Sequence, residues 1–179
     1  MKILMVTAET VPFAKTGGLA DMVSALAIQL TKMGHDVKIV MPRYYKIDRS
    51  KLTLLEGPMA IAAGQSETWS AVYTTTMPGC DKLSVYFIDH EQCFGRDGIY
   101  GVPSETDFHD NPYRFAVLNH GAFQLCRKLN WYPDVIHCHD WSACLAPAIL
   151  KHVCRYCGFE KTASVLTIHN QGYQGQYSK

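Results

Sequence analysis

The chain has 179 residues, of which 47% are hydrophobic and 18% are charged, and its formal net charge is +1. These values are typical of one globular domain or lobe with a sizeable core. Because no block of Lys and Arg occurs, a nucleic-acid partner is not expected. No stretch has the length of a membrane-spanning helix, and the short apolar run after Met1 lacks the features of a signal peptide. We therefore expect a cytoplasmic protein without a membrane partner.

The N-terminal region predicts a strand–helix–strand unit. Residues 2–7 contain an apolar run typical of a buried strand, and residues 18–33 show the apolar spacing of a helix. Gly34 follows as a helix-terminating glycine, and residues 36–41 form a second apolar strand. Such a unit predicts parallel strands with a right-handed crossover. We therefore expect an α/β fold with a Rossmann-like, doubly wound and mostly parallel sheet.

The loop between the first strand and the first helix contains Lys15, Gly17 and Gly18. Such a loop can bring backbone N–H groups and the positive end of a helix close to an anion, and Lys15 adds a full positive charge. The stretch is neither the dinucleotide fingerprint nor a Walker loop, because the lysine precedes the glycines. From the glycines alone, a plain strand-to-helix turn is an equally good interpretation.

The middle of the chain is β-rich. Residues 60–63, 68–77 and 83–89 form three runs separated by turn sequences, and alternation in the second run predicts antiparallel pairing. We expect a β-hairpin insertion whose last run rejoins the parallel sheet. Residues 91–110 carry several glycines and acidic residues and predict a long loop, which in a compact domain is functional or mobile.

The last third of the chain returns to alternating helices and strands. Residues 112–129 predict a helix with Asp110 or Asn111 as its cap and Pro112 at its first position. The remaining predicted elements are a strand at 134–138, a helix at 141–157 that Pro147 kinks or breaks, and a strand at 162–168.

The cysteines do not predict a disulfide framework or a metal centre. Their number is seven, which is odd, and no secretory signal accompanies them. Cys154 and Cys157 form one C-x-x-C pair, but a second pair to complete a zinc site is missing. His137, Cys138 and His139 are adjacent on a strand, where neighbours point to opposite faces, so all three cannot converge on one ion. We expect no metal.

Polar residues follow two of the predicted strands. His139, Asp140 and Trp141 follow one strand, and His169 and Asn170 follow the last. Ligands of open α/β sheets bind at the carboxyl ends of strands, so Asp140 can accept sugar hydroxyls and Trp141 can pack on an apolar sugar face. Alternatively, Asp140 caps the following helix and Trp141 belongs to the core. A lone histidine such as His169 is more often structural than catalytic.

Four stretches resemble motifs of bacterial glycogen synthases and plant starch synthases. In chain order they are Lys15-Thr16-Gly17-Gly18-Leu19-Ala20-Asp21, Asp110-Asn111-Pro112-Tyr113-Arg114-Phe115, His137-Cys138-His139-Asp140-Trp141 and Thr167-Ile168-His169-Asn170-Gln171-Gly172-Tyr173-Gln174-Gly175. The resemblance covers nearly the whole chain. It implies that residues 1–179 are the N-terminal, acceptor-side lobe of a two-lobe GT-B glycosyltransferase. This lobe is expected to be incomplete, with the C-terminal nucleotide-binding lobe absent.

By this resemblance, the reaction is transfer of glucose from ADP-glucose to the nonreducing end of an α-1,4-glucan, with retention and without a metal or further cofactor. Lys15, Gly17 and Gly18 would lie near the donor diphosphate, and Phe108 stands where the family often has a tyrosine. The predicted catalytic residues are His169, Asp140 and Asp21, and the predicted substrate-binding residues are Lys15, Gly17, Gly18, His139, Trp141, Asn170 and Phe108.

Two other interpretations remain open. The first is a related lobe that uses UDP-glucose, because the residues that read the base would lie in the second lobe. The second is a noncatalytic glucan-binding module, in which aromatic side chains such as Trp69 and Tyr73 contact glucan, although both are more simply strand formers. We also expect the chain to be inactive alone and able to self-associate through an exposed apolar edge.

Overall fold

The computed structural model describes residues 1–64 and 66–177. Its strands form one sheet in the order β3-β5-β6-β2-β1-β7-β8, and β4 pairs with β5 beside this path. The strands are β1 (Lys2–Val6), β2 (Asp36–Pro42), β3 (Thr53–Leu54), β4 (Met59–Ala63), β5 (Ser66–Met77), β6 (Cys80–Asp89), β7 (Val135–His139) and β8 (Ala163–Thr167). The helices are α1 (Gly18–Lys32), α2 (Glu91–Phe94), α3 (Asn111–Lys128) and α4 (Leu145–His152), with short 3-10 turns at Arg49–Lys51 and Trp141–Ala143.

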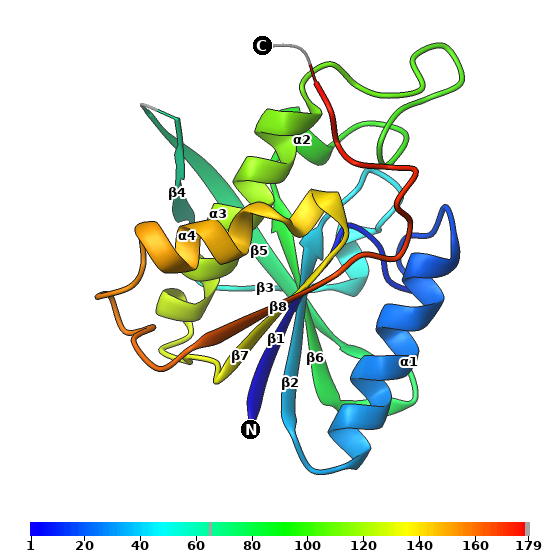
Figure 1. Ribbon diagram of the computed structural model, residues 1–179. Helices are drawn as coiled ribbons and strands as arrows, with labels where there is room; N and C mark the ends of the chain where they lie inside the picture. Colours follow the sequence, from blue (N-terminus) through cyan, green and yellow to red (C-terminus); the bar gives the residue numbers. More distant parts are fainter. Residues whose placement is uncertain (65, 178–179) are drawn as a thin grey trace.

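The centre of the sheet is parallel, as the sequence predicts. β6, β2, β1, β7 and β8 run in the same direction, so their carboxyl ends meet at one edge of the sheet. Helix α1 lies on one face, while α3 and α4 lie on the other (Figure 1). The inner strands β1 and β2 are largely buried on both sides, which explains why they read as nearly continuous apolar runs. The doubly wound α/β fold is therefore confirmed.

The β-hairpin insertion is also confirmed. β4 pairs with β5 and β5 with β6 in antiparallel fashion, and β6 then pairs with β2 in parallel. The third run of the insertion thus rejoins the main sheet. Gln65, in the predicted turn between β4 and β5, lies outside the described residues. The sequence does not predict β3, because two residues are too few to show a periodic pattern.

Helix α1 ends where Gly34 is expected to stop it. Gly34 has φ +90°, its N–H donates to the Thr31 carbonyl (3.0 Å), and the N–H of His35 donates to the Leu30 carbonyl (3.1 Å). This is the paired hydrogen-bond pattern of a Schellman motif, in which a left-handed glycine satisfies the last carbonyls of the helix. A side chain at position 34 would be strained in this backbone conformation.

Two helix predictions need correction. Helix α3 begins at Asn111 after its N-cap Asp110, so Pro112 is the second helical residue rather than the first. The predicted helix over residues 141–157 is shorter, because a 3-10 turn precedes α4 and α4 already ends at His152. Pro147 is the third residue of α4 and lies in its first turn, where a missing N–H costs no hydrogen bond, so it neither kinks nor breaks the helix.

β8 forms the outer edge of the parallel sheet, and its apolar side chains are exposed. Val165 and Leu166 are 45% and 42% exposed, and the following Ile168 is 63% exposed. The self-association expected from such an edge stays a prediction. Within residues 1–64 and 66–177, no helix is both long and apolar enough to cross a membrane.

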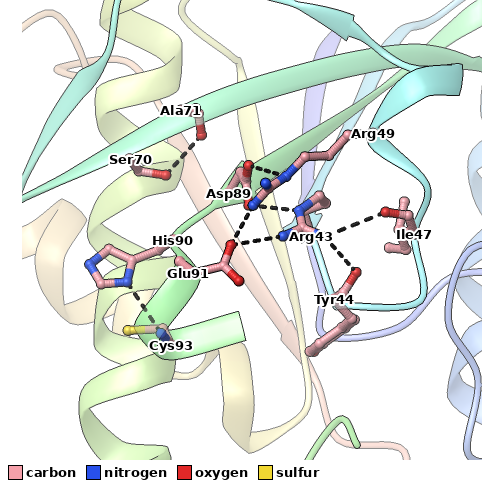
Figure 2. A network of polar contacts seen from close by, with 10 residues as sticks. All are labelled: Arg43, Tyr44, Ile47, Arg49, Ser70, Ala71, Asp89, His90, Glu91 and Cys93. Carbon is pink, nitrogen blue, oxygen red and sulfur yellow. Dashed lines mark hydrogen bonds and ion pairs between the residues drawn. The ribbon is translucent and has the colours of Figure 1, made fainter. Parts of the chain in front are cut away.

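A buried ion-pair network ties the carboxyl ends of β2 and β6 together (Figure 2). Arg43 follows β2 and donates through Nε to Oδ1 of Asp89, the last residue of β6, at 2.6 Å. The Arg43 and Asp89 side chains are both buried, at 5% and 6% exposure. The more exposed Arg49 and Glu91 extend the network toward the surface, with Arg49 Nε 2.9 Å from Asp89 Oδ2. This network holds together the carboxyl ends of β2 and β6, at the same edge of the sheet as the site.

Candidate active site

A large cavity lies at the carboxyl edge of the parallel strands. Its volume is about 810 Å³, and its walls come from the loop before α1, the loop after β7 and the segment after β8. In Figure 1 the chain after β8 crosses this edge and continues beside the loop that follows α2. Of the predicted site residues, Gly17, Gly18, Asp140, Trp141, His169 and Asn170 line the cavity. The convergence of the three predicted clusters on one site is thus an observed feature of the fold.

Gly17 and Gly18 stand at the start of α1, with Gly17 as its N-cap. Gly17 has φ −147° and ψ −161°, which any residue adopts, and Gly18 is helical. A Cβ atom at either position would meet no protein atom within 4 Å. Neither the backbone nor the packing of the protein therefore requires glycine here. A ligand that approaches the backbone closely is a sufficient reason for both glycines.

The loop before α1 differs in one respect from the prediction. The N–H groups of Thr16 and Gly17 do not face an anion in the cavity, because both donate to Oε2 of the buried Glu9. The N–H groups of Gly18 and Leu19 belong to the first turn of α1, where no intrahelical acceptor exists. These two N–H groups, at the positive end of a 15-residue helix, remain for an anionic ligand.

Lys15 belongs to the same loop, but its side chain does not line the cavity described above. Its Nζ is 2.6 Å from Asp21 Oδ2, and the two side chains are 49% and 55% exposed. Lys15 lines a neighbouring cavity of about 400 Å³ rather than the one of about 810 Å³, and its Nζ donates to both carboxylate oxygens of Asp21. An exposed pair of this kind contributes little to stability, so Lys15 is free to exchange its partner for a ligand. The predicted roles of Lys15 and Asp21 stay predictions.

Asp140 holds the segment after β8 in place. Its Oδ1 accepts hydrogen bonds from the backbone N–H groups of His169 (2.6 Å) and Asn170 (3.4 Å). The alternative that its side chain caps the following turn is wrong, because no such hydrogen bond is formed. Asp140 also has φ +59° and ψ −175°, a conformation that is nearly restricted to glycine. This strain at a cavity wall indicates a functional constraint.

Three histidines form a row from the strands to the cavity. The ring of His137 lies 4.2 Å from that of His139 between centroids, and Nδ1 of His139 is 3.1 Å from Nε2 of His169. His169 lines the cavity, whereas His139 is 0% exposed and does not. Burial, together with the neighbouring His137 and His169, lowers the pKa of His139 to about 3. His139 is therefore a neutral support behind His169 in this chain, and its predicted contact with substrate stays a prediction.

Acid is expected to destabilise the chain through this row. An unfolded histidine binds a proton near pH 6.5, but folded His139 does so only near pH 3, so stability rises with pH and is lost as pH falls from 6.5 toward 3. We expect the free energy of unfolding to drop by about 2 kcal/mol between about pH 7.5 and about pH 5. Urea unfolding at both pH values measures this drop. His139→Asn should reduce this drop in the free energy of unfolding, whereas His152→Asn, at an exposed histidine, should leave it unchanged. Equal stability of the wild type at both pH values would contradict the lowered pKa of His139.

Aromatic side chains form one wall of the cavity. The ring centroid of Trp141 lies 5.7 Å from that of Tyr100 and 4.9 Å from that of Phe115. Trp141 is partly buried and still lines the cavity, so the core and ligand interpretations of this residue are compatible. A Cβ atom on Gly175 would approach the Trp141 ring to 2.5 Å, which shows how closely the C-terminal segment covers it.

Phe108 lies away from this wall. It is 5% exposed, and the guanidinium groups of Arg96 and Arg114 lie 4.3 and 4.9 Å from its ring centroid. Arg114 is itself 0% exposed and donates to the carbonyls of Cys93 and Ile99, which organises the loop that the sequence predicts between residues 91 and 110. Phe108 therefore belongs to the support of this loop, and its predicted contact with substrate stays a prediction.

Several residues of the cavity are absent from the sequence-based prediction. They are Glu9, Thr16, Leu19, Tyr100, Thr106, Asp107 and Tyr173. Thr16, Leu19 and Tyr173 lie within the stretches that resemble synthase motifs, so the sequence could have identified them as candidate site residues. Tyr100 and Asp107 come from an irregular loop whose path has no periodic pattern. In residues 1–64 and 66–177, no group of three or more His, Cys, Asp or Glu side chains is arranged to hold a metal.

The fold and the site define an α/β lobe with a cavity at the carboxyl ends of its parallel strands, between a helix N-terminus and an aromatic wall. The chain matches the family model described as the starch synthase catalytic domain over residues 2–179, and it belongs to this family.

Curated relatives and a solved structure agree with this assignment. The chain is 58% identical over 179 residues to a glycogen synthase of Treponema denticola, covering 100% of this chain and 36% of that protein. It is 41% identical to glycogen synthase 2 of Geobacter metallireducens, covering 99% and 36%. The catalytic domain of starch synthase IV from Arabidopsis thaliana, bound to ADP and acarbose, superposes with a TM-score of 0.84 at 27% identity, covering 97% of this chain and 35% of that one. The chain thus spans about a third of the length of these relatives and corresponds to their N-terminal part.

Proposed function

We propose that this chain forms the N-terminal lobe of a glycogen synthase. The complete enzyme transfers glucose from ADP-glucose to the nonreducing end of an α-1,4-glucan, with retention at the anomeric carbon. The glycogen synthases among its relatives and the ADP and acarbose bound to the starch synthase IV structure support this proposal. The proposed reaction needs ADP-glucose as a donor substrate and no further cofactor.

The observation that carries the proposal is the pair of glycines before α1. Gly17 and Gly18 line the cavity, yet neither is required by the backbone or by the packing of the protein. A diphosphate seated against Gly18 and Leu19 would receive their N–H groups and the positive end of α1. These groups would stabilise the charge that develops on the diphosphate as it leaves, which is electrostatic catalysis in a prearranged site.

The opposite side of the cavity fits a sugar. Asp140, His169 and Asn170 supply polar groups there, and Trp141 supplies a flat apolar surface. Lys15 belongs to the loop before α1 and would add its charge to the donor site once it leaves Asp21. In this proposal the chain provides half of the cleft, so it is expected to be inactive alone.

Replacing Gly18 with alanine separates folding from ligand binding. Alanine favours helix, and its Cβ meets no protein atom within 4 Å, so the stability of Gly18→Ala should equal that of the wild type or exceed it by up to about 1 kcal/mol. The same Cβ would occupy ligand space. In a fusion of this chain with the remaining C-terminal length of the Treponema denticola enzyme, glucosyl incorporation into glycogen should fall at least about tenfold. Unchanged incorporation by a correctly folded Gly18→Ala fusion would reject the proposed donor site.

The same fusion tests the alternatives. Faster incorporation from UDP-glucose than from ADP-glucose would favour the UDP-glucose transferase. The glucan-binding alternative is supported by Trp69, which is 61% exposed on β5. Maltooligosaccharide binding that Trp69→Ala abolishes, without any transfer by the fusion, would favour this module. Incorporation by the 179-residue chain alone, above a Lys15→Ala control, would contradict its expected inactivity. A cytoplasmic location and self-association remain part of the proposal.

A further inference from the structure

The carboxylate of Glu9 lies beneath the loop that leads into α1. Glu9 is 2% exposed. Its Oε2 accepts hydrogen bonds from the N–H groups of Thr16 and Gly17, the latter at 3.3 Å. Its Oε1 accepts from the hydroxyls of Thr16 and Tyr100, each at 2.8 Å. One buried side chain thus receives four donors from two segments that are far apart in the sequence.

These hydrogen bonds hold the loop in place because the Glu9 carboxylate has no cationic partner among the described residues. Among the described residues, no Lys, Arg or His forms an ion pair with Glu9. A buried charge without a cation is tolerated only when strong hydrogen bonds satisfy it. Any movement of Thr16 or Gly17 away from Glu9 would leave this charge unsatisfied. The loop is therefore kept in one conformation even without a ligand.

Tyr100 connects this anchor to the aromatic wall. Burial, and next the nearby carboxylate of Glu9, raise the pKa of Tyr100 well above its usual value, so its hydroxyl remains a donor. The Tyr100 ring packs on Trp141, and the Tyr100 carbonyl accepts from the side chain of Asn111 at 2.8 Å. Glu9 therefore fixes the loop before α1 and the cavity wall relative to each other.

We infer that Glu9 is a positioning residue that presets the donor-binding loop by acting as an internal anion. It turns the N–H groups of Thr16 and Gly17 inward, and it thereby places those of Gly18 and Leu19 as the pair left for the diphosphate. The identity of the ligand rests on the proposed function, whereas the role of Glu9 in ordering the loop does not. Without Glu9, the four N–H groups would compete for the ligand in a loop that has no fixed shape.

The ordering role is tested by amide hydrogen exchange on the 179-residue chain. In Glu9→Gln the charge and one of the two acceptor oxygens are lost, so the hydrogen bonds from Thr16 and Gly17 are no longer charge-assisted and exchange at both should accelerate at least about tenfold. Exchange at Val23, inside α1, should stay unchanged and shows that the fold is intact. Glu56→Gln, at an exposed glutamate, is the matched control and should have no effect. Wild-type exchange at Thr16 and Gly17 in Glu9→Gln would overturn the inference.

Tyr100→Phe provides a milder variant if Glu9→Gln does not fold. It removes one of the four donors, and a smaller acceleration of exchange at Thr16 is expected; unchanged exchange would again overturn the inference. In the fusion enzyme, Glu9→Gln should raise KM for ADP-glucose at least about tenfold and change kcat less, since donor binding is weakened in ground and transition states alike. A wild-type KM would overturn the inference. A wild-type fusion that neither binds ADP-glucose nor transfers glucose would reject the proposed function, and the exchange experiment would still decide the role of Glu9.

Discussion

Replacing Asp89 with alanine is expected to lower the free energy of unfolding by about 3–5 kcal/mol. The substitution removes the buried partner of Arg43 Nε, and only the carbonyls of Tyr44 and Ile47 and the mostly exposed Glu91, at 3.4 Å from Nη2, remain for its guanidinium group (Figure 2). Domains of this size are stable by only about 5–15 kcal/mol, so much of the margin would be lost. Urea unfolding of the 179-residue chain measures the change.

Two further variants distinguish loss of the buried pair from loss of any carboxylate in the network. Glu91→Ala removes a carboxylate whose side chain is 64% exposed, and we expect a loss below about 1 kcal/mol. The double variant Arg43→Met with Asp89→Leu replaces the pair by apolar groups and should recover most of the stability, because no charge remains buried. Equal small losses in Asp89→Ala and Glu91→Ala would show that the pair does not support the fold.

The second large effect is expected at Asp140, where two variants should lose activity alike but differ in stability. Asp140→Ala and Asp140→Gly both remove the carboxylate that holds the N–H groups of His169 and Asn170. In the fusion enzyme, both variants should lose glucosyl transfer by about 10²-fold or more, because small displacements of groups around the substrate have effects of this size. Incorporation of glucose into glycogen at saturating ADP-glucose measures this loss.

Stability should respond differently in the two variants. Alanine keeps the strained backbone at φ +59° and ψ −175°, whereas glycine adopts it freely. Asp140→Gly should therefore unfold with a free energy about 1–3 kcal/mol higher than that of Asp140→Ala. Equal stability of the two would mean that the backbone relaxes without cost, and wild-type activity in either would remove Asp140 from the site.

The sequence could predict those residues of the site that follow strands. Asp140 and His169 each stand just after an apolar strand, Gly17 and Gly18 end the loop that follows the first strand, and parallel strands bring such positions to one edge. Glu9 also follows the first strand, but nothing in the sequence shows that its side chain turns back under the loop. Its partners Thr16 and Tyr100 are 7 and 91 positions away, and only the folded chain brings them together.

The sequence by itself determined the parallel α/β core, the β insertion and the edge at which the cavity lies, because these depend on local periodicity and on the fixed direction of parallel strands. Only the tertiary structure decided which polar residues face the cavity. It placed His139 behind His169 and buried Phe108 beneath two arginines. The physical reason is that burial and hydrogen-bond partners depend on contacts between distant segments, which leave no periodic pattern in the sequence.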